Sequence, residues 1–208
     1  MPLKNLNELQ KKLNEAAREK SKAKRGVKIA AVIAEALRTI GENPVLVGGS
    51  AVEFYTEGKY TTNDIDMTAI GGEDLWEVMQ QLGFERLGKD FVRKKLKIYV
   101  EFPSETLREG EQSDLLDVDG ISLRIISIED LIVDRLCSYK FWRFLDDGLN
   151  ALILLELKSV DEQRLLKQAE RKDVADALQA IQNIYVESYR KKLSKKKSSQ
   201  KLQEWLLR

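Results

Sequence analysis

The chain has 208 residues, of which 43% are hydrophobic, enough for one ample domain or for a core domain with a helical appendage. It contains no histidine, and Cys137 is its one cysteine, which excludes His-based zinc sites, Ser-His-Asp catalysis and an internal disulfide. The net charge of +1 indicates no particular partner. No apolar run is long enough to span a membrane and the N-terminus lacks a signal-peptide core, so we expect a cytoplasmic protein.

Residues 1–40 are predicted to form N-terminal helices that pack on the core. Residues 1–25 are polar and end in a basic cluster at residues 20–25, which we interpret as a solvated helix end, with an RNA contact as the alternative. Residues 27–40 have helical apolar spacing, and Gly41 is placed to end that helix. The apolar face of this helix consists of Ile29, Val32, Ile33, Ala36 and Leu37.

The most informative stretch runs from residue 44 to residue 67. Residues 44–47 are apolar and predict a short buried strand, which Gly48-Gly49 follows with a tight turn. Ser50 is placed to cap a helix at residues 51–55. A helix N-terminus presents free backbone N–H groups and positive dipole charge, so Gly48, Gly49 and Ser50 are candidate phosphate-binding residues.

Two aspartates separated by one apolar residue, Asp64-Ile65-Asp66, follow on the next predicted strand. Residues i and i+2 of a strand point to the same face, so the two carboxylates are expected side by side while Ile65 enters the core. Carboxylates this close repel each other unless a cation lies between them, and Mg²⁺ prefers oxygen ligands of this kind. The alternative is a pair of solvated aspartates in a βαβ-like unit.

The predicted core spans residues 41–126 and continues with a helix near residues 73–82 and further strands. In the strand at residues 97–102, Ile98, Val100 and Phe102 alternate with Glu101, which therefore points to the opposite face. Asp119-Gly120 predicts a hairpin with a type I′ turn.

The rest of the chain is predicted to be a C-terminal helical region at residues 127–189 followed by a basic tail at residues 190–208. The tail holds seven basic residues and no acidic residue between 190 and 201, and we expect it to be mobile before a short amphipathic end. The order of elements predicts an α+β fold, with a mixed β-sheet core and flanking helices followed by a C-terminal helical bundle.

Val47-Gly48-Gly49-Ser50, followed after a spacer by Asp64-Ile65-Asp66-Met67, resembles the signature of the DNA polymerase beta-like nucleotidyltransferase superfamily. The resemblance implies a Mg²⁺-dependent enzyme that transfers an NMP from an NTP, ATP among them, to a hydroxyl acceptor. It implies that Asp64, Asp66 and a third carboxylate, best matched by Glu101, hold two Mg²⁺ ions, with Mn²⁺ as an alternative. It further implies that Gly48, Gly49 and Ser50 hold the triphosphate. Without the aspartate pair, Glu101 would be interpreted as a surface residue.

A second stretch, residues 125–155, is similar to the segment after the core in stand-alone prokaryotic nucleotidyltransferases near the type IV abortive-infection toxins. Ile128 stands where proline is common in that group. In these proteins a basic residue on this helix faces the nucleotide, and Lys140 matches it best, with Arg135 as the second choice. A surface lysine is the alternative for Lys140. The resemblance covers about residues 44–155.

The sequence leaves the acceptor open between RNA, a protein hydroxyl and a small molecule. The basic cluster at residues 20–25 and the basic tail favour RNA through phosphate contacts. The resemblance to the toxin group adds an antitoxin protein as an expected partner, and no membrane partner is expected. The alternatives are a non-catalytic nucleotide- or partner-binding module on the same fold, and a structural domain in which the motif is a coincidence.

Overall fold

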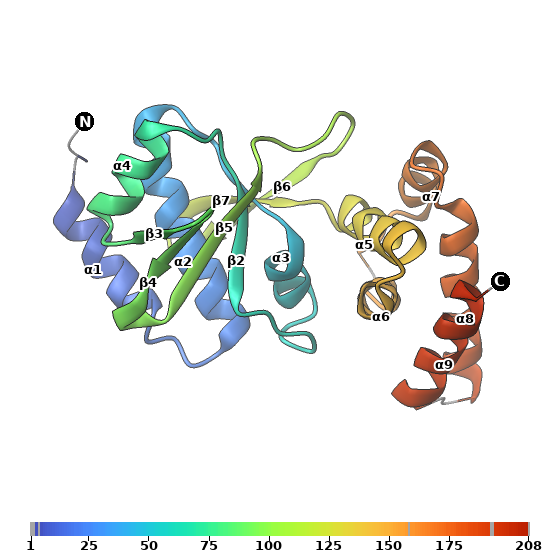
Figure 1. Cartoon of the computed structure of the whole chain (residues 1–208). Helices are drawn as coiled ribbons and strands as arrows, with labels where there is room; N and C mark the ends of the chain where they lie inside the picture. The colour runs from blue at the N-terminus through green and yellow to red at the C-terminus, as the bar shows by residue number, and fades with distance from the viewer. Residues whose placement is uncertain (1–2, 4, 158, 192–193, 208) are drawn as a thin grey trace. The chain divides into compact units, whose positions relative to one another are not determined.

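A computed structural model of the chain describes residues 3, 5–157, 159–191 and 194–207 (Figure 1). The chain divides into two compact units, residues 1–127 and residues 128–208. The first unit contains a mixed sheet with flanking helices, and the described part of the second unit is helical. The α+β fold predicted from the sequence is therefore confirmed.

The first unit, called the core unit below, contains four α-helices and seven strands among its described residues. The helices are α1 (Leu6–Ala16), α2 (Lys22–Leu37), α3 (Gly48–Tyr55) and α4 (Glu73–Gln81), with short 3-10 helices η1 (Arg38–Ile40) and η2 (Lys94–Leu96). The strands are β1 (Val45–Leu46), β2 (Asp64–Thr68), β3 (Glu85–Leu87), β4 (Asp90–Arg93), β5 (Ile98–Ser104), β6 (Ser113–Val118) and β7 (Ile121–Ile126).

The sheet has the order β3-β4-β5-β2-β1-β7-β6. The central strand β2 pairs antiparallel with β1 and parallel with β5, and β1 pairs parallel with β7. The remaining neighbours are antiparallel, including the β6–β7 hairpin. At the tip of this hairpin Asp119 and Gly120 both have positive φ, 52° and 81°, which confirms the type I′ turn predicted from the Asp-Gly pair.

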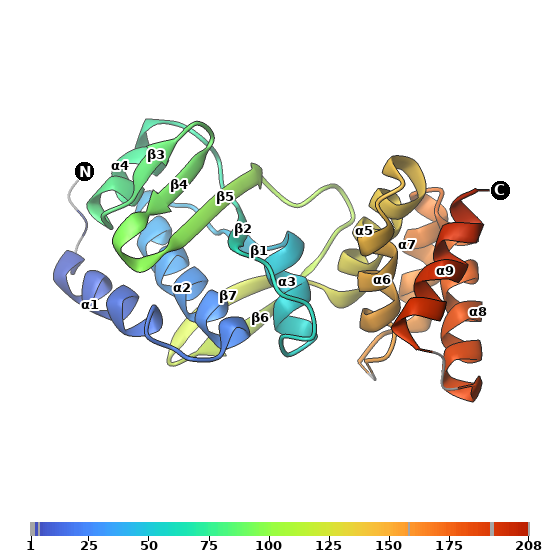
Figure 2. The same cartoon turned by 60° about the horizontal axis from the view of Figure 1, so that its bottom comes forward.

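Helix α2 forms the centre of the core. Its apolar face is buried, including Ile29, Val32, Ile33 and Leu37, as its helical spacing predicts. This helix packs on α1, α3, α4 and on strands of the sheet, and Figure 2 shows α1 and α2 along the same face of the sheet. Gly41 ends the segment after η1 with a left-handed φ of 85°, in agreement with the prediction.

The second unit, called the helical unit below, contains α5 (Ile128–Trp142), α6 (Leu145–Leu154), α7 (Glu162–Arg171), α8 (Ala175–Lys191) and α9 (Lys195–Leu206). Helix α5 packs on α6, α7 and α8, and α9 packs on α6 and α8. None of the helices in the described ranges is long and apolar enough to cross a membrane.

Helix α9 corrects the expectation of a mobile basic tail. The side chain of Leu202 is fully buried, and the backbone oxygen of Leu202 accepts a hydrogen bond of 2.6 Å from the Tyr139 hydroxyl. The ring of Trp205 stacks on the ring of Tyr139 at 5.3 Å, and Arg143 donates to the carbonyl of Leu206. The prediction of a mobile tail was wrong for residues 195–201, which belong to α9, because the hydrogen bond and ring contact that hold this helix come from Tyr139 on α5, far back in the sequence. The amphipathic end that the sequence predicts after residue 201 forms the last part of the same helix. Residues 192, 193 and 208 of the predicted tail lie outside the described residues.

Candidate active site

The three acidic residues singled out in the sequence come from two neighbouring strands, β2 and β5. In the register of this parallel pair Asp66 lies opposite Glu101, and Asp64 lies opposite Tyr99. Ile65 and Met67 are buried on one face of β2, whereas Asp64 and Asp66 are half-buried on the other. Because neighbouring strands lie about 4.8 Å apart, the backbone positions of all three acids adjoin. We call Asp64, Asp66 and Glu101 the carboxylate face.

The carboxylate face fits a hard divalent cation in donor type and in backbone position. Its side chains, however, do not converge: the described residues contain no group of three Asp, Glu, His or Cys side chains close enough to hold a metal ion. The carboxylate of Asp66 turns toward α3, and Glu101 Oε2 lies 3.5 Å from Lys89 Nζ. Two of the three candidate ligands therefore already contact protein groups.

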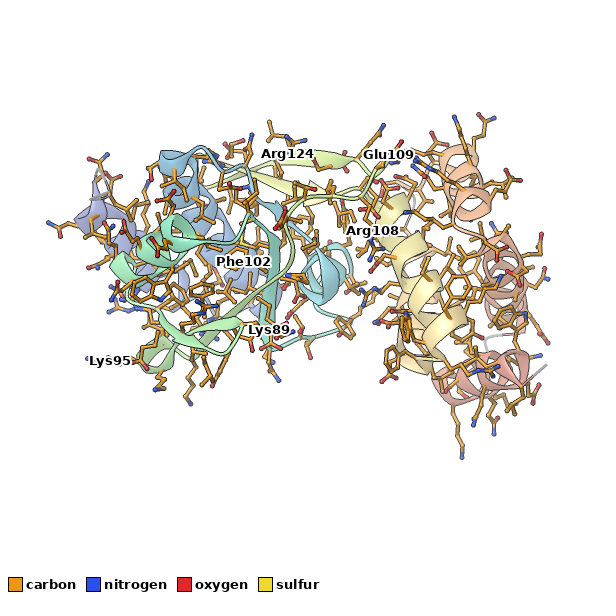
Figure 3. The ribbon with its side chains drawn as sticks, turned by 45° about the horizontal axis from the view of Figure 1, so that its top comes forward. Lys89, Lys95, Phe102, Arg108, Glu109 and Arg124 are labelled. Atoms are coloured by element: carbon orange, nitrogen blue, oxygen red, sulfur yellow. The ribbon has the colours of Figure 1, made fainter. Side chains whose placement is uncertain are left out.

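Lys89 is a residue of this site that the sequence did not indicate. It lies in the turn between β3 and β4. Figure 3 labels Lys89 and also Phe102, which belongs to β5. A lysine in a short hairpin turn is an ordinary surface residue, so no local signal connects it with Glu101. The pairing of β4 with β5 brings it there.

The glycine pair lies at the start of α3, which begins at Gly48 with Val47 as its N-cap. Gly48 has a φ of +57°, and a Cβ at this position would lie 2.6 Å from Asp66 Oδ2. Glycine is therefore required at position 48 for its backbone conformation and for the close approach of α3 to β2.

Ser50 does not cap the helix as predicted, because it lies within the first turn of α3. Its hydroxyl accepts a hydrogen bond from the backbone N–H of Asp66 at 3.0 Å and donates one to the backbone oxygen of Asp64 at 2.7 Å. Ser50 is almost fully buried, so this hydroxyl joins α3 to both ends of the Asp64-Ile65-Asp66 segment. Its role here is to position the two aspartates.

The free N–H groups at the start of α3 are directed at a carboxylate of the protein. The backbone N–H groups of Gly49 and Ser50 donate to Asp66 Oδ2 at 2.9 and 3.4 Å. The positive end of the helix dipole favours such an anion. These two N–H groups thus already hold an anionic side chain of the protein, and the phosphate-binding roles of Gly48, Gly49 and Ser50 stay predictions.

Lys140, the predicted nucleotide contact, lies on α5 in the helical unit. Its ammonium donates to Asp176 Oδ1 at 2.9 Å and to the carbonyl of Asp173 at 2.6 Å, and the hydrogen bond to Asp176 raises the pKa of Lys140. Arg135, the second choice, bridges Asp134 and Asp147 at 2.5 and 2.8 Å. Both cations are thus paired within the helical unit, and a nucleotide-binding role for Lys140 stays a prediction.

No protein-family model and no curated protein matches this sequence. Among solved structures, the chain is similar to an antigenic nucleotidyltransferase-like protein from Paracoccidioides brasiliensis, with 14% sequence identity and a TM-score of 0.53. The match covers 77% of this chain and 94% of that chain. At this level of identity the likeness concerns the fold, and it supports the description of the chain as having a nucleotidyltransferase-like fold.

Proposed function

We propose that the protein is a Mg²⁺-dependent nucleotidyltransferase that moves an NMP from an NTP to a hydroxyl acceptor. The observation that carries the proposal is the register of β2 and β5, in which Asp66 lies opposite Glu101 while Asp64 shares the face of Asp66. The start of α3 adjoins this carboxylate face through Gly49 and Ser50. The nucleotidyltransferase-like fold of a solved neighbour supports the same activity.

In the proposed reaction the acceptor oxygen bonds to the α-phosphorus, and the bond from this phosphorus to the bridging oxygen of the β-phosphate breaks. Pyrophosphate leaves with the electron pair, and the hydroxyl proton is released to water. Asp64, Asp66 and Glu101 would hold Mg²⁺, which when bound neutralises triphosphate charge and activates the attacking hydroxyl. Ser50 positions the two aspartates through its hydrogen bonds to the β2 backbone.

The start of α3 is the proposed triphosphate subsite. Phosphate oxygens would accept from the N–H groups of Gly49 and Ser50, replacing Asp66 Oδ2 as their acceptor. This exchange would release the Asp66 carboxylate toward its neighbours on the carboxylate face. Lys140 is proposed as a further nucleotide contact on the strength of the sequence resemblance. That resemblance is also the basis for a toxin–antitoxin role, in which the acceptor is RNA or a protein.

The test is the incorporation of an α-labelled NTP with Mg²⁺ or Mn²⁺, offering total RNA and cell protein as acceptors. The variants are Asp64→Asn/Asp66→Asn and Glu101→Gln. Glu105→Gln is the matched control, because Glu105 directly follows β5 and is exposed. Label should enter one acceptor class with the wild type and with Glu105→Gln, and should be lost with the other two variants.

Two results would contradict the proposal in different ways. Metal-dependent NTP binding without transfer to any acceptor would favour the alternative, a nucleotide- or partner-binding module on the same fold. Equal transfer by the wild type and the Asp64→Asn/Asp66→Asn variant would place the chemistry away from the carboxylate face.

A further inference from the structure

A cavity of about 720 Å³ lies in the core unit beside the carboxylate face. Its walls come from the start of α2, from α3, from residues 62–65 and from residues 94–99. The apolar part of the lining includes three buried isoleucines, Ile29, Ile65 and Ile98. Asp64 and Ser50 also line the cavity, whereas Asp66 and Glu101 do not. The cavity is large enough for a nucleotide-sized ligand and reaches one end of the carboxylate face.

An incompletely satisfied carboxylate lines this cavity. Glu53 on α3 is only 6% exposed, and its Oε2 accepts a hydrogen bond from the Thr62 N–H at 3.1 Å. Its Oε1 is buried and has no hydrogen-bond partner within the described part of the chain. Because leaving a buried acceptor unsatisfied is costly, this atom points to a ligand that brings a hydrogen-bond donor, such as a hydroxyl or an amino group.

Positively charged side chains also line this cavity. Lys22 and Lys97 line it, are exposed, and form no ion pair with any residue in the described ranges. Arg25 also lines it, and its Nε is buried without a hydrogen-bond partner among the described residues. Lys22 and Arg25 lie in the first turn of α2, which carries no acidic residue, so these two cations lie at the positive end of a helix dipole, and Lys97 lines the same cavity. Positive charge from these side chains and from the helix dipole favours the binding of a phosphate group.

These observations describe a ligand that carries both a phosphate group and hydrogen-bond donors. A nucleoside phosphate has this character, and two further exposed lysines, Lys20 and Lys24, stand two positions before and after Lys22 in the sequence. We propose that the cavity is the acceptor subsite of the transferase and holds the 3′-terminal nucleotide of a single-stranded RNA. The ribose hydroxyls would meet Glu53 and Asp64, and the phosphates would meet Lys22 and Lys97. The proposal rests on the proposed nucleotidyl transfer.

The experiment measures binding of a labelled single-stranded RNA of about six nucleotides with a free 3′-hydroxyl to the full chain. The test variant is Lys22→Glu/Lys97→Glu, and Lys95→Glu gives a local control. Lys95 belongs to the same short helix as Lys94, does not line the cavity and extends outward from the ribbon in Figure 3. Thermal unfolding checks that each variant is folded. A third variant, Glu53→Gln, removes the buried carboxylate and leaves the lysines that line the cavity unchanged.

The double variant should bind the RNA at least about tenfold more weakly, whereas Lys95→Glu should stay within about twofold of the wild type. Glu53→Gln should bind RNA with a free 3′-hydroxyl more weakly, and the wild type should prefer that RNA to one ending in a 3′-phosphate. Equal weakening by Lys22→Glu/Lys97→Glu and by Lys95→Glu would overturn the proposal. The proposal would also be overturned if AMP binds to the protein and the short RNA does not displace it. That result would favour a pocket for small nucleotides.

Binding of NTP, measured separately on the same proteins, distinguishes this inference from the proposed function. Loss of RNA binding in a variant that keeps metal-dependent NTP binding would support the acceptor subsite. If the wild type binds RNA but neither binds nor transfers an NTP, the proposed transferase function is overturned, and the acceptor role of the cavity with it. Unchanged RNA affinity in Lys22→Glu/Lys97→Glu, with NTP transfer intact, would overturn the subsite alone.

Discussion

Ser50 and Asp66 are joined in both directions: the Ser50 hydroxyl accepts from the backbone N–H of Asp66 at 3.0 Å, and the Ser50 N–H donates to the Asp66 carboxylate at 3.4 Å. The same hydroxyl donates to the backbone oxygen of Asp64. The first turn of α3 and the strand that carries both aspartates therefore form one hydrogen-bonded piece. A change at position 50 should alter the candidate site without removing any charged group from it.

Ser50→Ala tests this connection. It removes one hydroxyl and leaves the Asp66 N–H and the Asp64 carbonyl without that partner in a buried place, which should cost about 1–3 kcal/mol of unfolding free energy. Ser122→Ala, at an exposed position on β7, should change it by less than about 0.5 kcal/mol. Chemical denaturation measures both, and equal effects at the two positions would show that the Ser50 hydroxyl does not stabilise the core.

Gly48→Ala tests the close approach of α3 to β2, and Gly88 provides a matched control. Both glycines have left-handed φ values, +57° and +65°, so an added Cβ should cost each about 1–2 kcal/mol in backbone conformation. A Cβ at Gly88 meets nothing within 4 Å, whereas at Gly48 it would lie 2.6 Å from Asp66 Oδ2. Thermal unfolding should therefore show a larger loss for Gly48→Ala.

The same pair of variants also separates conformation from site geometry. Metal-dependent NTP binding, measured by titration, should weaken with Gly48→Ala, because Asp66 has to move, and should be kept with Gly88→Ala. Equal losses of stability and of NTP binding in the two variants would mean that position 48 matters only for its φ angle.

Tyr139→Phe tests the attachment of α9. The Tyr139 hydroxyl is buried, which raises its pKa, and it donates to the backbone oxygen of Leu202 at 2.6 Å. Loss of this hydrogen bond should lower the unfolding free energy by about 1–2 kcal/mol and should speed proteolysis within residues 195–207. Tyr185→Phe on α8 is the control, because the Tyr185 hydroxyl has no hydrogen-bond partner among the described residues. Unchanged cleavage of Tyr139→Phe would show that this bond does not anchor the helix.

The pair of Lys140 and Asp176 predicts a dependence of stability on pH. Burial acts to raise the pKa of Asp176, but the hydrogen bond and the charge of Lys140, together with backbone hydrogen bonds at the start of α8, outweigh it, so this pKa lies below its ordinary value of 3.8. The contribution of Asp176 is then fully present above the pKa of the unfolded chain and is lost as the pH falls through the pKa of the folded chain. Because Asp176 is 58% exposed, the contribution should stay below about 1 kcal/mol.

The measurement compares the unfolding free energies of the wild type and Asp176→Asn from about pH 7 down to about pH 3. The difference between them should be constant near neutral pH and should shrink at the acidic end. A difference that persists unchanged to the lowest pH at which the protein folds would assign the effect of the substitution to packing.

The parts of the fold that the sequence predicted correctly are those with local signals. The face of α2 follows from helical spacing, and the turn at Asp119-Gly120 follows from the backbone preferences of two residues. The shared face of Asp64 and Asp66 follows from the two-residue period of a strand, once the strand is assigned.

The errors and omissions concern residues whose partners lie far away in the sequence. Ser50 looked like a helix cap, but its hydroxyl bonds residues 14 and 16 positions further along. Helix α9 looked like a mobile tail because its anchor, Tyr139, lies on α5, 63 residues before Leu202. The cavity beside Asp64 combines segments between residues 22 and 99, so its mixture of Glu53 and lysines has no signature in any one segment.

The order of the sheet also has a consequence for how the chain is made. Strand β1 lies in the interior of the sheet, and one of its two neighbours is β7, which is the last strand of the core unit to be synthesised. A nascent chain therefore carries β1 with one open edge until residue 126 has left the ribosome. Because open strand edges pair readily with other chains, translation pauses before β7 expose the chain to aggregation and chaperone binding.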